Sequence, residues 1–189
     1  MAREVRTCRL EDWEGNIYKL EGTGGSGGAT GTVISPTENI NNIETDGTVV
    51  EDPESSGSAI IISSGATEKN FATVYVDGLI FGDYSVTLRL KSSNNSTANN
   101  LLQIKTYYSL EGANDILLST TNVAGTAFAA ANVYQQLNFI TKFKGVANVN
   151  MRMKIVITAL PNTNTTFCFD YAAVTMASGS MLNTVTVLN

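Results

Sequence analysis

The stretch 81–108, FGDYSVTLRLKSSNNSTANNLLQIKTYY, contains the pattern that decides the fold. Apolar and polar residues alternate over 84–91 and again over 102–107, and a period of two sorts side chains onto opposite faces of a strand. The residues between them, 92–100, are small and polar and favour turns. The stretch therefore predicts two half-buried strands paired as an antiparallel hairpin. Its polar face would carry Arg89, Lys91 and Lys105.

Further short strands are predicted on both sides of this hairpin. Apolar runs or alternations occupy 59–62, 71–76, 116–118, 137–143, 149–157 and 167–173, and 182–188 is a candidate edge strand. The alanine-rich residues 123–133 fit either a single helical turn or a loop. About eight or nine such strands without a convincing helix predict an all-β protein of two packed sheets. A jelly-roll β-sandwich is favoured over an immunoglobulin arrangement, because no Cys-Trp-Cys core is present.

The first third of the chain differs in composition from the rest. Residues 1–21 are dense in charge, with a predicted tight turn at 12–16 that lets 9–10 pair with 17–18. A glycine-rich stretch and an acidic stretch follow. We therefore expect three parts: an N-terminal arm over 1–21, a Gly-rich and acidic linker over 22–56, and the sandwich over 57–189.

Charge and composition exclude several classes of function. The net charge is -5, with a balance of -7 over 1–54 and +2 over 55–189, and no basic stripe indicates nucleic-acid binding. The sequence has no apolar run of about 18 residues, so membrane insertion is not predicted, and no secretory signal is visible. Histidine is absent, which removes the commonest general base and the commonest transition-metal ligand. We expect no catalytic residues, no metal and no cofactor.

Two features leave alternatives open. Cys8 and Cys168 could form a disulfide, but two unpaired thiols, one of them in a core strand, are favoured. The acidic run 51–54 could contribute to a Ca²⁺ site, but it lacks the spacing of a calcium-binding loop, and a solvated charge run is favoured.

The segment 134–171 carries one resemblance to a known family. It reads Y-x-x-L-x-F, then M-x-M-x-I-x-I, then F-x-F-D-Y followed by A-A-V-T. This pattern resembles the C-terminal half of jelly-roll carbohydrate-binding modules. The resemblance implies the same sandwich fold and a non-catalytic module that binds a glycan, either freestanding or cut from a larger enzyme.

A second resemblance lies in the arm, whose residues 10–18 read L-E-D-W-E-G-N-I-Y. This stretch is similar to the start of many bacteriophage tail-fibre, baseplate and other virion proteins, although Lys19-Leu20 replaces their usual Pro-x-Thr. The resemblance implies a structural virion protein that is made in the host cytoplasm and exposed after lysis. It also implies that the protein assembles as a homotrimer. The arm would dock onto other virion proteins through Leu10, Asp12, Trp13, Gly15, Asn16 and Tyr18.

Glycan binding needs aromatic platforms beside amide or carboxylate groups. The candidates are Tyr107, Tyr108 and Tyr134 with Asn94, Asn95 and Asn99 in the adjoining loop. A host-surface glycan is therefore an expected partner. An enzyme would need a carboxylate pair, and the sequence selects none among Asp77, Asp83, Glu111, Asp115 and Asp170.

Overall fold

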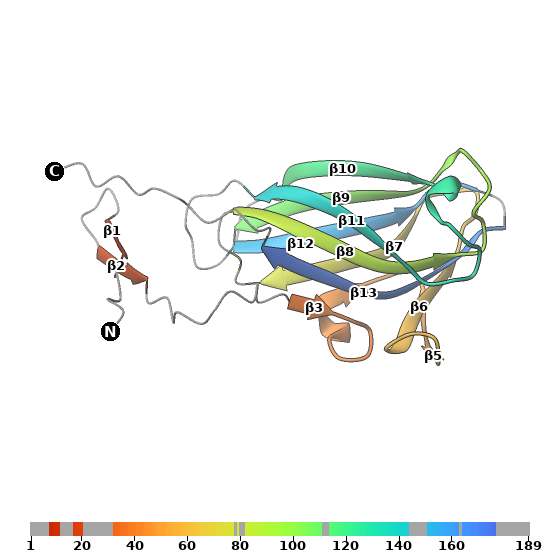
Figure 1. The fold of residues 1–189 in the computed structure, drawn as a ribbon, viewed down its shortest axis with the longest axis horizontal. Coiled ribbons are helices and arrows are strands. Elements are labelled where there is room, and N and C mark those ends of the chain that lie inside the picture. The colour runs from red at the N-terminus through yellow and green to blue at the C-terminus, as the bar shows by residue number, and fades with distance from the viewer. Residues whose placement is uncertain are drawn as a thin grey trace, which may run out of the picture.

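The computed structural model describes residues 8–11, 17–20, 32–77, 79, 82–110, 114–143, 151–162 and 164–176. Its main body is a jelly-roll β-sandwich of two antiparallel sheets, as predicted (Figure 1). One sheet has the order β10 (Ile116–Ala124), β9 (Asn100–Leu110), β12 (Met151–Ala159), β7 (Lys69–Asp77) and β4 (Ile43–Glu44). The other has the order β11 (Gln135–Phe143), β8 (Gly82–Ser92), β13 (Thr166–Met176), β6 (Gly57–Ser63) and β5 (Thr48–Asp52), and β3 (Thr32–Ile34) also pairs with β13.

The core lies between the two sheets and follows the alternation of the sequence. On β8, Leu88 and Leu90 are fully buried, while their neighbours in the chain face outward. Phe71 on β7 contacts two rings of β13, with centroids 5.8 Å from Phe167 and 6.3 Å from Phe169. Burial of apolar area between the layers is the main stabilising term in such a sandwich. The outer faces of both sheets therefore remain free for polar groups.

The central hairpin prediction is wrong. β8 pairs with β11 and β13, whereas β9 pairs with β10 and β12, so the two strands belong to opposite sheets. Stacked sheets lie about 10 Å apart, and the seven residues 93–99 can span up to roughly 23 Å. Crossing between layers lets both strands bury their apolar faces in one core. As a result, Arg89 and Lys91 lie on one outer face of the sandwich, and Lys105 lies on the other.

Part of the predicted linker belongs to the sandwich. Residues 32–56 contribute β3, β4, β5 and the 3₁₀ turn η1 (Ile40–Asn42), and these strands pair with β13, β7 and β6. Ile34 and Ile43 are buried in the core. The composition of this segment concealed its strands, because β3 and β4 each bury one apolar side chain and β5 buries none.

In the arm, β1 (Cys8–Glu11) and β2 (Ile17–Leu20) pair antiparallel as predicted, with Leu10 opposite Tyr18. Four of the predicted anchoring residues, Asp12, Trp13, Gly15 and Asn16, lie outside the described residues, as does the candidate edge strand 182–188.

Three smaller expectations can also be compared with the structure. The alanine-rich segment contains a single 3₁₀ turn, η2 (Gly125–Ala127), followed by a loop. Cys168 is a buried free thiol in β13. Among the helical residues described, no helix has the length and hydropathy of a membrane-crossing one.

Candidate functional site

Four side chains form a row across the outer face of the five-stranded sheet. Strand pairing places Leu117 on β10 opposite Tyr107 on β9, Tyr107 opposite Lys154 on β12, and Lys154 opposite Tyr75 on β7. We call Leu117, Tyr107, Lys154 and Tyr75 the tyrosine row. Because neighbouring strands lie about 4.8 Å apart, the two tyrosine backbones are separated by roughly 10 Å.

The tyrosine row faces solvent. Leu117 is 52% exposed, and both tyrosines and Lys154 are half-buried. The alternation of the strands explains this placement, because Ile155 and Val74, the chain neighbours of Lys154 and Tyr75, point into the core. The row is thus a surface of two aromatic rings, one cation and one apolar side chain that the described part of the sandwich leaves partly exposed.

Charged neighbours hold Lys154 in the middle of the row. Its ammonium donates a hydrogen bond to Asp115, with 2.8 Å between Nζ and Oδ2. The same nitrogen lies 5.7 Å from the ring centroid of Tyr107. The hydrogen bond to Asp115 raises the pKa of Lys154, so the cation is retained at neutral pH.

The ring of Tyr75 is held from two sides. Its hydroxyl donates to Glu44 on β4 at 3.0 Å, and the guanidinium of Arg152 lies 5.1 Å from the ring centroid. Arg152 in turn donates to both carboxylate oxygens of Asp77, at 2.6 and 3.2 Å. Burial and the hydrogen bond to Glu44 raise the pKa of Tyr75, so its hydroxyl remains a donor at neutral pH. Restraint of this kind lowers the entropy that a ring loses when a ligand binds.

Amide groups lie beside the row on the same face. Gln103 on β9 donates a hydrogen bond to Asn122 on β10 at 3.1 Å. Gln103 is two residues before Lys105 on the same strand. Lys105 lies between Gln103 and Tyr107 on the outer side of β9 and is half-buried. Aromatic rings, amides and a cation on one open face are the groups with which proteins bind polar ligands that also have apolar surfaces.

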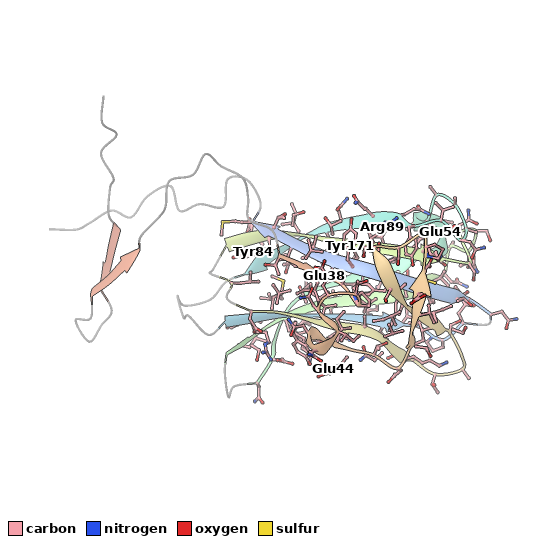
Figure 2. All side chains as sticks on the ribbon, turned by 90° about the horizontal axis from the view of Figure 1, so that it is seen from below. Glu38, Glu44, Glu54, Tyr84, Arg89 and Tyr171 are labelled. Carbon is pink, nitrogen blue, oxygen red and sulfur yellow. The ribbon has the colours of Figure 1, made fainter. Side chains whose placement is uncertain are left out.

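The outer face of the other sheet has a different character. Figure 2 shows Arg89, Glu54 and Tyr171 on one side of the sandwich and Glu44 on the opposite side. On the side of Arg89, the fully buried Asp170 forms an ion pair with Arg89. Asp170 also accepts hydrogen bonds from the backbone N–H and the hydroxyl of Ser56, at 2.9 and 2.6 Å. The strand pairing is irregular between Phe169 and Tyr171, and such a bulge redirects a side chain.

Tyr134 belongs to this second network. Its ring centroid lies 4.6 Å from the guanidinium carbon of Arg89 and 4.5 Å from Nζ of Lys91, and its hydroxyl donates to Asp52 at 3.0 Å. Lys91 also donates to Asp52 at 2.7 Å and to Glu54 at 3.2 Å. These contacts attach the β5–β6 turn to β8. The acidic run at 51–54 is therefore partly paired and is not simply a solvated charge run.

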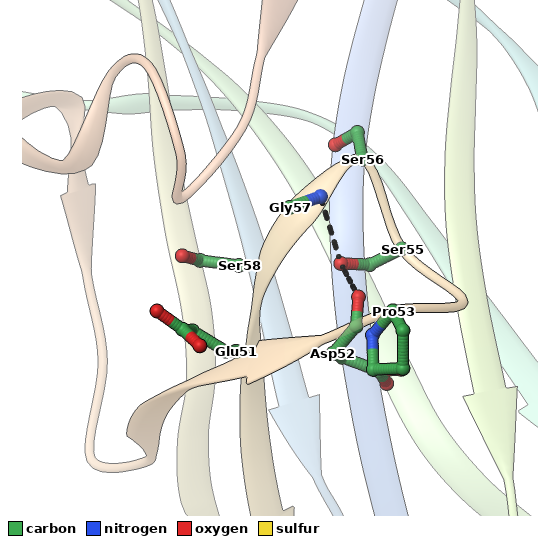
Figure 3. A pocket seen from close by; sticks show the side chains of 7 residues that line it. All are labelled: Glu51, Asp52, Pro53, Ser55, Ser56, Gly57 and Ser58. Atoms are coloured by element: carbon green, nitrogen blue, oxygen red, sulfur yellow. Dashed lines mark hydrogen bonds between the residues drawn. The ribbon is translucent and has the colours of Figure 1, made fainter.

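A hollow of about 560 Å³ lies beside the same turn (Figure 3). It is lined by Glu51, Asp52, Pro53, Ser55, Ser56, Gly57 and Ser58. No aromatic ring is among these lining residues, and within the described part of the chain no cluster of acidic or sulfur side chains could hold a metal ion. Hydrogen bonds within the turn, such as Gly57 N–H to Ser55 Oγ at 3.1 Å, occupy much of its polar lining. The tyrosine row is the stronger candidate for a ligand site.

The structure does not bring the six predicted glycan-binding residues together. Tyr107 is in the tyrosine row, and Tyr108 packs against the core. Tyr134 directly precedes β11 and lies beside Arg89 and Lys91 on the outer face of the other sheet. Asn94, Asn95 and Asn99 lie in the β8–β9 crossing at one end of the sandwich (Figure 1). The Asn94 side chain accepts from the N–H groups of Ser96 and Thr97, which makes it a turn-forming residue.

Tyr75, Lys154 and Leu117 were missed as site residues. Tyr75 and Lys154 occupy polar-facing positions of alternating strands, which is the available signal in the sequence. Their assembly depends on which strands become neighbours, and the pattern of a single strand does not specify that. Among the carboxylates considered for catalysis, Asp77, Asp115 and Asp170 each bind a different cation, and Glu111 lies outside the described residues.

No protein-family model and no curated protein matches this sequence. Solved structures with a similar shape include the xylan-binding module CBM15, at 11% identity and a TM-score of 0.47 over 79% of this chain and 98% of that one. The family 11 carbohydrate-binding module of a Clostridium thermocellum cellulase is 13% identical, with a TM-score of 0.44 over 93% and 97%. Tailspike protein 4 of bacteriophage CBA120 is 12% identical, with a TM-score of 0.47 over 74% of this chain and 20% of that one. Because the identities and TM-scores are this low, no ligand or residue role transfers to this chain.

Proposed function

We propose that this protein is a non-catalytic glycan-binding module whose site is the outer face of the five-stranded sheet. The observation that carries the proposal is the register that makes Tyr75 and Tyr107 the two cross-strand neighbours of Lys154. Pyranose rings have apolar faces that stack on aromatic side chains and hydroxyl rims that take hydrogen bonds from charged and amide groups. A separation of roughly 10 Å between the tyrosine backbones suits about two consecutive sugar units lying across the strands.

The open face favours binding an internal section of a polysaccharide over enclosing the terminal sugar of that polysaccharide. The row runs perpendicular to the strands and continues to exposed Leu117 at β10, the edge strand of its sheet. An extended polysaccharide can cross such a surface in either direction. We therefore expect affinity to rise with oligosaccharide length until the row is covered.

Affinity electrophoresis against a panel of soluble polysaccharides tests this function, with calorimetry on any ligand found. Tyr107→Ala and Tyr75→Ala should each weaken binding by roughly ten-fold or more, because central aromatic contacts dominate such interfaces. Tyr171→Ala is the matched control, since Tyr171 is a half-buried outer-face tyrosine of the other sheet. Equal losses in all three variants, or no binding to any polysaccharide, would contradict the proposal.

The setting on a bacteriophage particle is a separate proposal that follows from the arm. In that setting residues 1–21 contact other virion proteins, three copies associate, and the sandwich presents its tyrosine row to a host-surface glycan. The pairing of β1 with β2 gives the arm a hairpin that could serve as the contact. Light scattering on the purified protein tests the association, and a strictly monomeric species at micromolar concentration would count against the trimer.

A further inference from the structure

Lys105 lies on the proposed binding face, and none of the carboxylates in the described part of the chain forms an ion pair with it. Its cross-strand neighbours are Thr120 on β10 and Val156 on β12, which carry no charge. Within the described residues, no ion pair or hydrogen bond involves its ammonium group, although the side chain is half-buried. Lys105 is thus held at the face beside Tyr107 with its charge unmatched.

Three described carboxylates of this face are already engaged elsewhere. Asp115 is matched by Lys154 at 2.8 Å, and Asp77 is matched by Arg152 at 2.6 Å. Glu44 lies three strands from β9, on β4, where it accepts the hydroxyl of Tyr75. Three cations, Lys105, Lys154 and Arg152, thus face three carboxylates in number, but none of these carboxylates forms an ion pair with Lys105.

Geometry relates the unpaired cation of Lys105 to the row. Lys105 is two residues from Tyr107 on the same side of β9, so both side chains leave the sheet about 7 Å apart along the strand. Lys154 is a diagonal neighbour of Lys105 across β9 and β12, because Val156 is its direct partner. An anionic group reaching Lys105 would replace water without breaking an existing ion pair.

We propose that the ligand is an acidic polysaccharide, with a sugar carboxylate bound by Nζ of Lys105 while adjoining sugar rings lie on Tyr107 and Tyr75. This inference rests on the proposed glycan-binding function and adds the chemical class of the ligand. Hydrogen bonds between an ammonium and a carboxylate are among the stronger polar contacts, and their affinity falls as salt screens the charges.

The experiment measures binding of polygalacturonate, alginate and hyaluronate, each beside its methyl-esterified form, which keeps the sugar and removes the charge. For at least one pair, the acid form should bind the wild-type protein roughly ten-fold more tightly than the ester, and added NaCl should reduce this difference. Lys105→Gln should weaken binding of the acid form by roughly ten-fold, so that the difference between acid and ester is abolished. Lys142→Gln, at an exposed lysine on β11 of the other sheet, should leave both affinities unchanged.

The outcomes separate the two proposals. Equal affinity for acid and ester forms, or an equal effect of Lys105→Gln and Lys142→Gln, overturns the acidic-ligand inference and leaves the glycan-binding function standing. If the protein binds only neutral polysaccharides and Tyr107→Ala loses this binding, the acidic-ligand inference is likewise overturned and the glycan-binding function stands. Absence of binding to every polysaccharide overturns both. Circular dichroism and the urea midpoint of each variant show whether it is folded.

Discussion

Tyr75 and Tyr107 lie two strands apart on one face of the same sheet, with Lys154 as the direct cross-strand neighbour of both. Neither ring is in the core, and both remain half-buried among polar groups. Tyr134, on the opposite face, is instead covered by two cations and bonded to Asp52. The protein thus has an open tyrosine face and a closed one, and the two can be tested separately.

The closed face should depend strongly on Asp170. Asp170→Asn removes the charge opposite Arg89 and disturbs the contacts to Ser56 in a fully buried position, so we expect a loss of roughly 2–3 kcal/mol in the free energy of unfolding. Asp77→Asn removes an exposed ion pair with Arg152 and should cost less than about 1 kcal/mol. Urea unfolding measures both. Comparable losses in the two variants would show that burial of Asp170 does not determine its contribution.

Asp52 should make stability depend on acid. The hydrogen bond from Lys91 is the largest influence that lowers the pKa of Asp52 below its ordinary value of 3.8, with burial opposing it. A lowered folded pKa contributes stability that is present above the unfolded value and is lost as pH falls through the folded one. Wild type should therefore exceed Asp52→Asn in unfolding free energy near neutral pH, and the gap should close below pH 3.8. A gap that stays constant across this range would contradict the assignment.

Tyr134 should contribute to stability and leave ligand binding unchanged. Tyr134→Phe keeps the ring beneath Arg89 and Lys91 but removes the hydroxyl bond to Asp52, which should cost about 1 kcal/mol. Tyr134→Ala also removes the ring and both cation–π contacts and should cost roughly 2–3 kcal/mol. Thermal unfolding measures whether the Ala variant loses more stability than the Phe variant. The polysaccharide affinity of the Phe variant should equal that of wild type. Lost binding in the Phe variant would contradict the proposed site and indicate that the ligand binds on the face around Tyr134.

The β5–β6 turn should not tolerate a side chain at Gly57. Its φ of 139° lies in a region that L residues rarely adopt, and a Cβ would come within 2.8 Å of Thr37 Oγ1. Gly57→Ala should cost roughly 1–3 kcal/mol. Gly65→Ala should be close to neutral, because its Cβ would meet the flexible end of Lys69 at 3.5 Å from Cε and 3.7 Å from Nζ. Urea midpoints that do not differ between these variants would contradict the strained turn.

Local patterns were sufficient for the strands but not for their partners. The alternations over 84–91 and 102–107 identified β8 and β9, yet the two strands lie in opposite sheets. Alternation shows which side chains face the core, and it does not show from which layer they face it. The same limit applies to the site: Tyr107 was identified as a candidate, whereas Tyr75 and Lys154 became its companions only through the order β9-β12-β7.

The measurement that tests the central claim most directly is a titration of the isotopically labelled protein with a bound oligosaccharide, followed by amide chemical shifts. We predict that the shifts concentrate at 103–107 on β9, 152–156 on β12 and 73–75 on β7, while β11, β8 and β13 are unchanged. Shifts concentrated on the face around Tyr134, or at the turn 51–58, would contradict the tyrosine row as the ligand site.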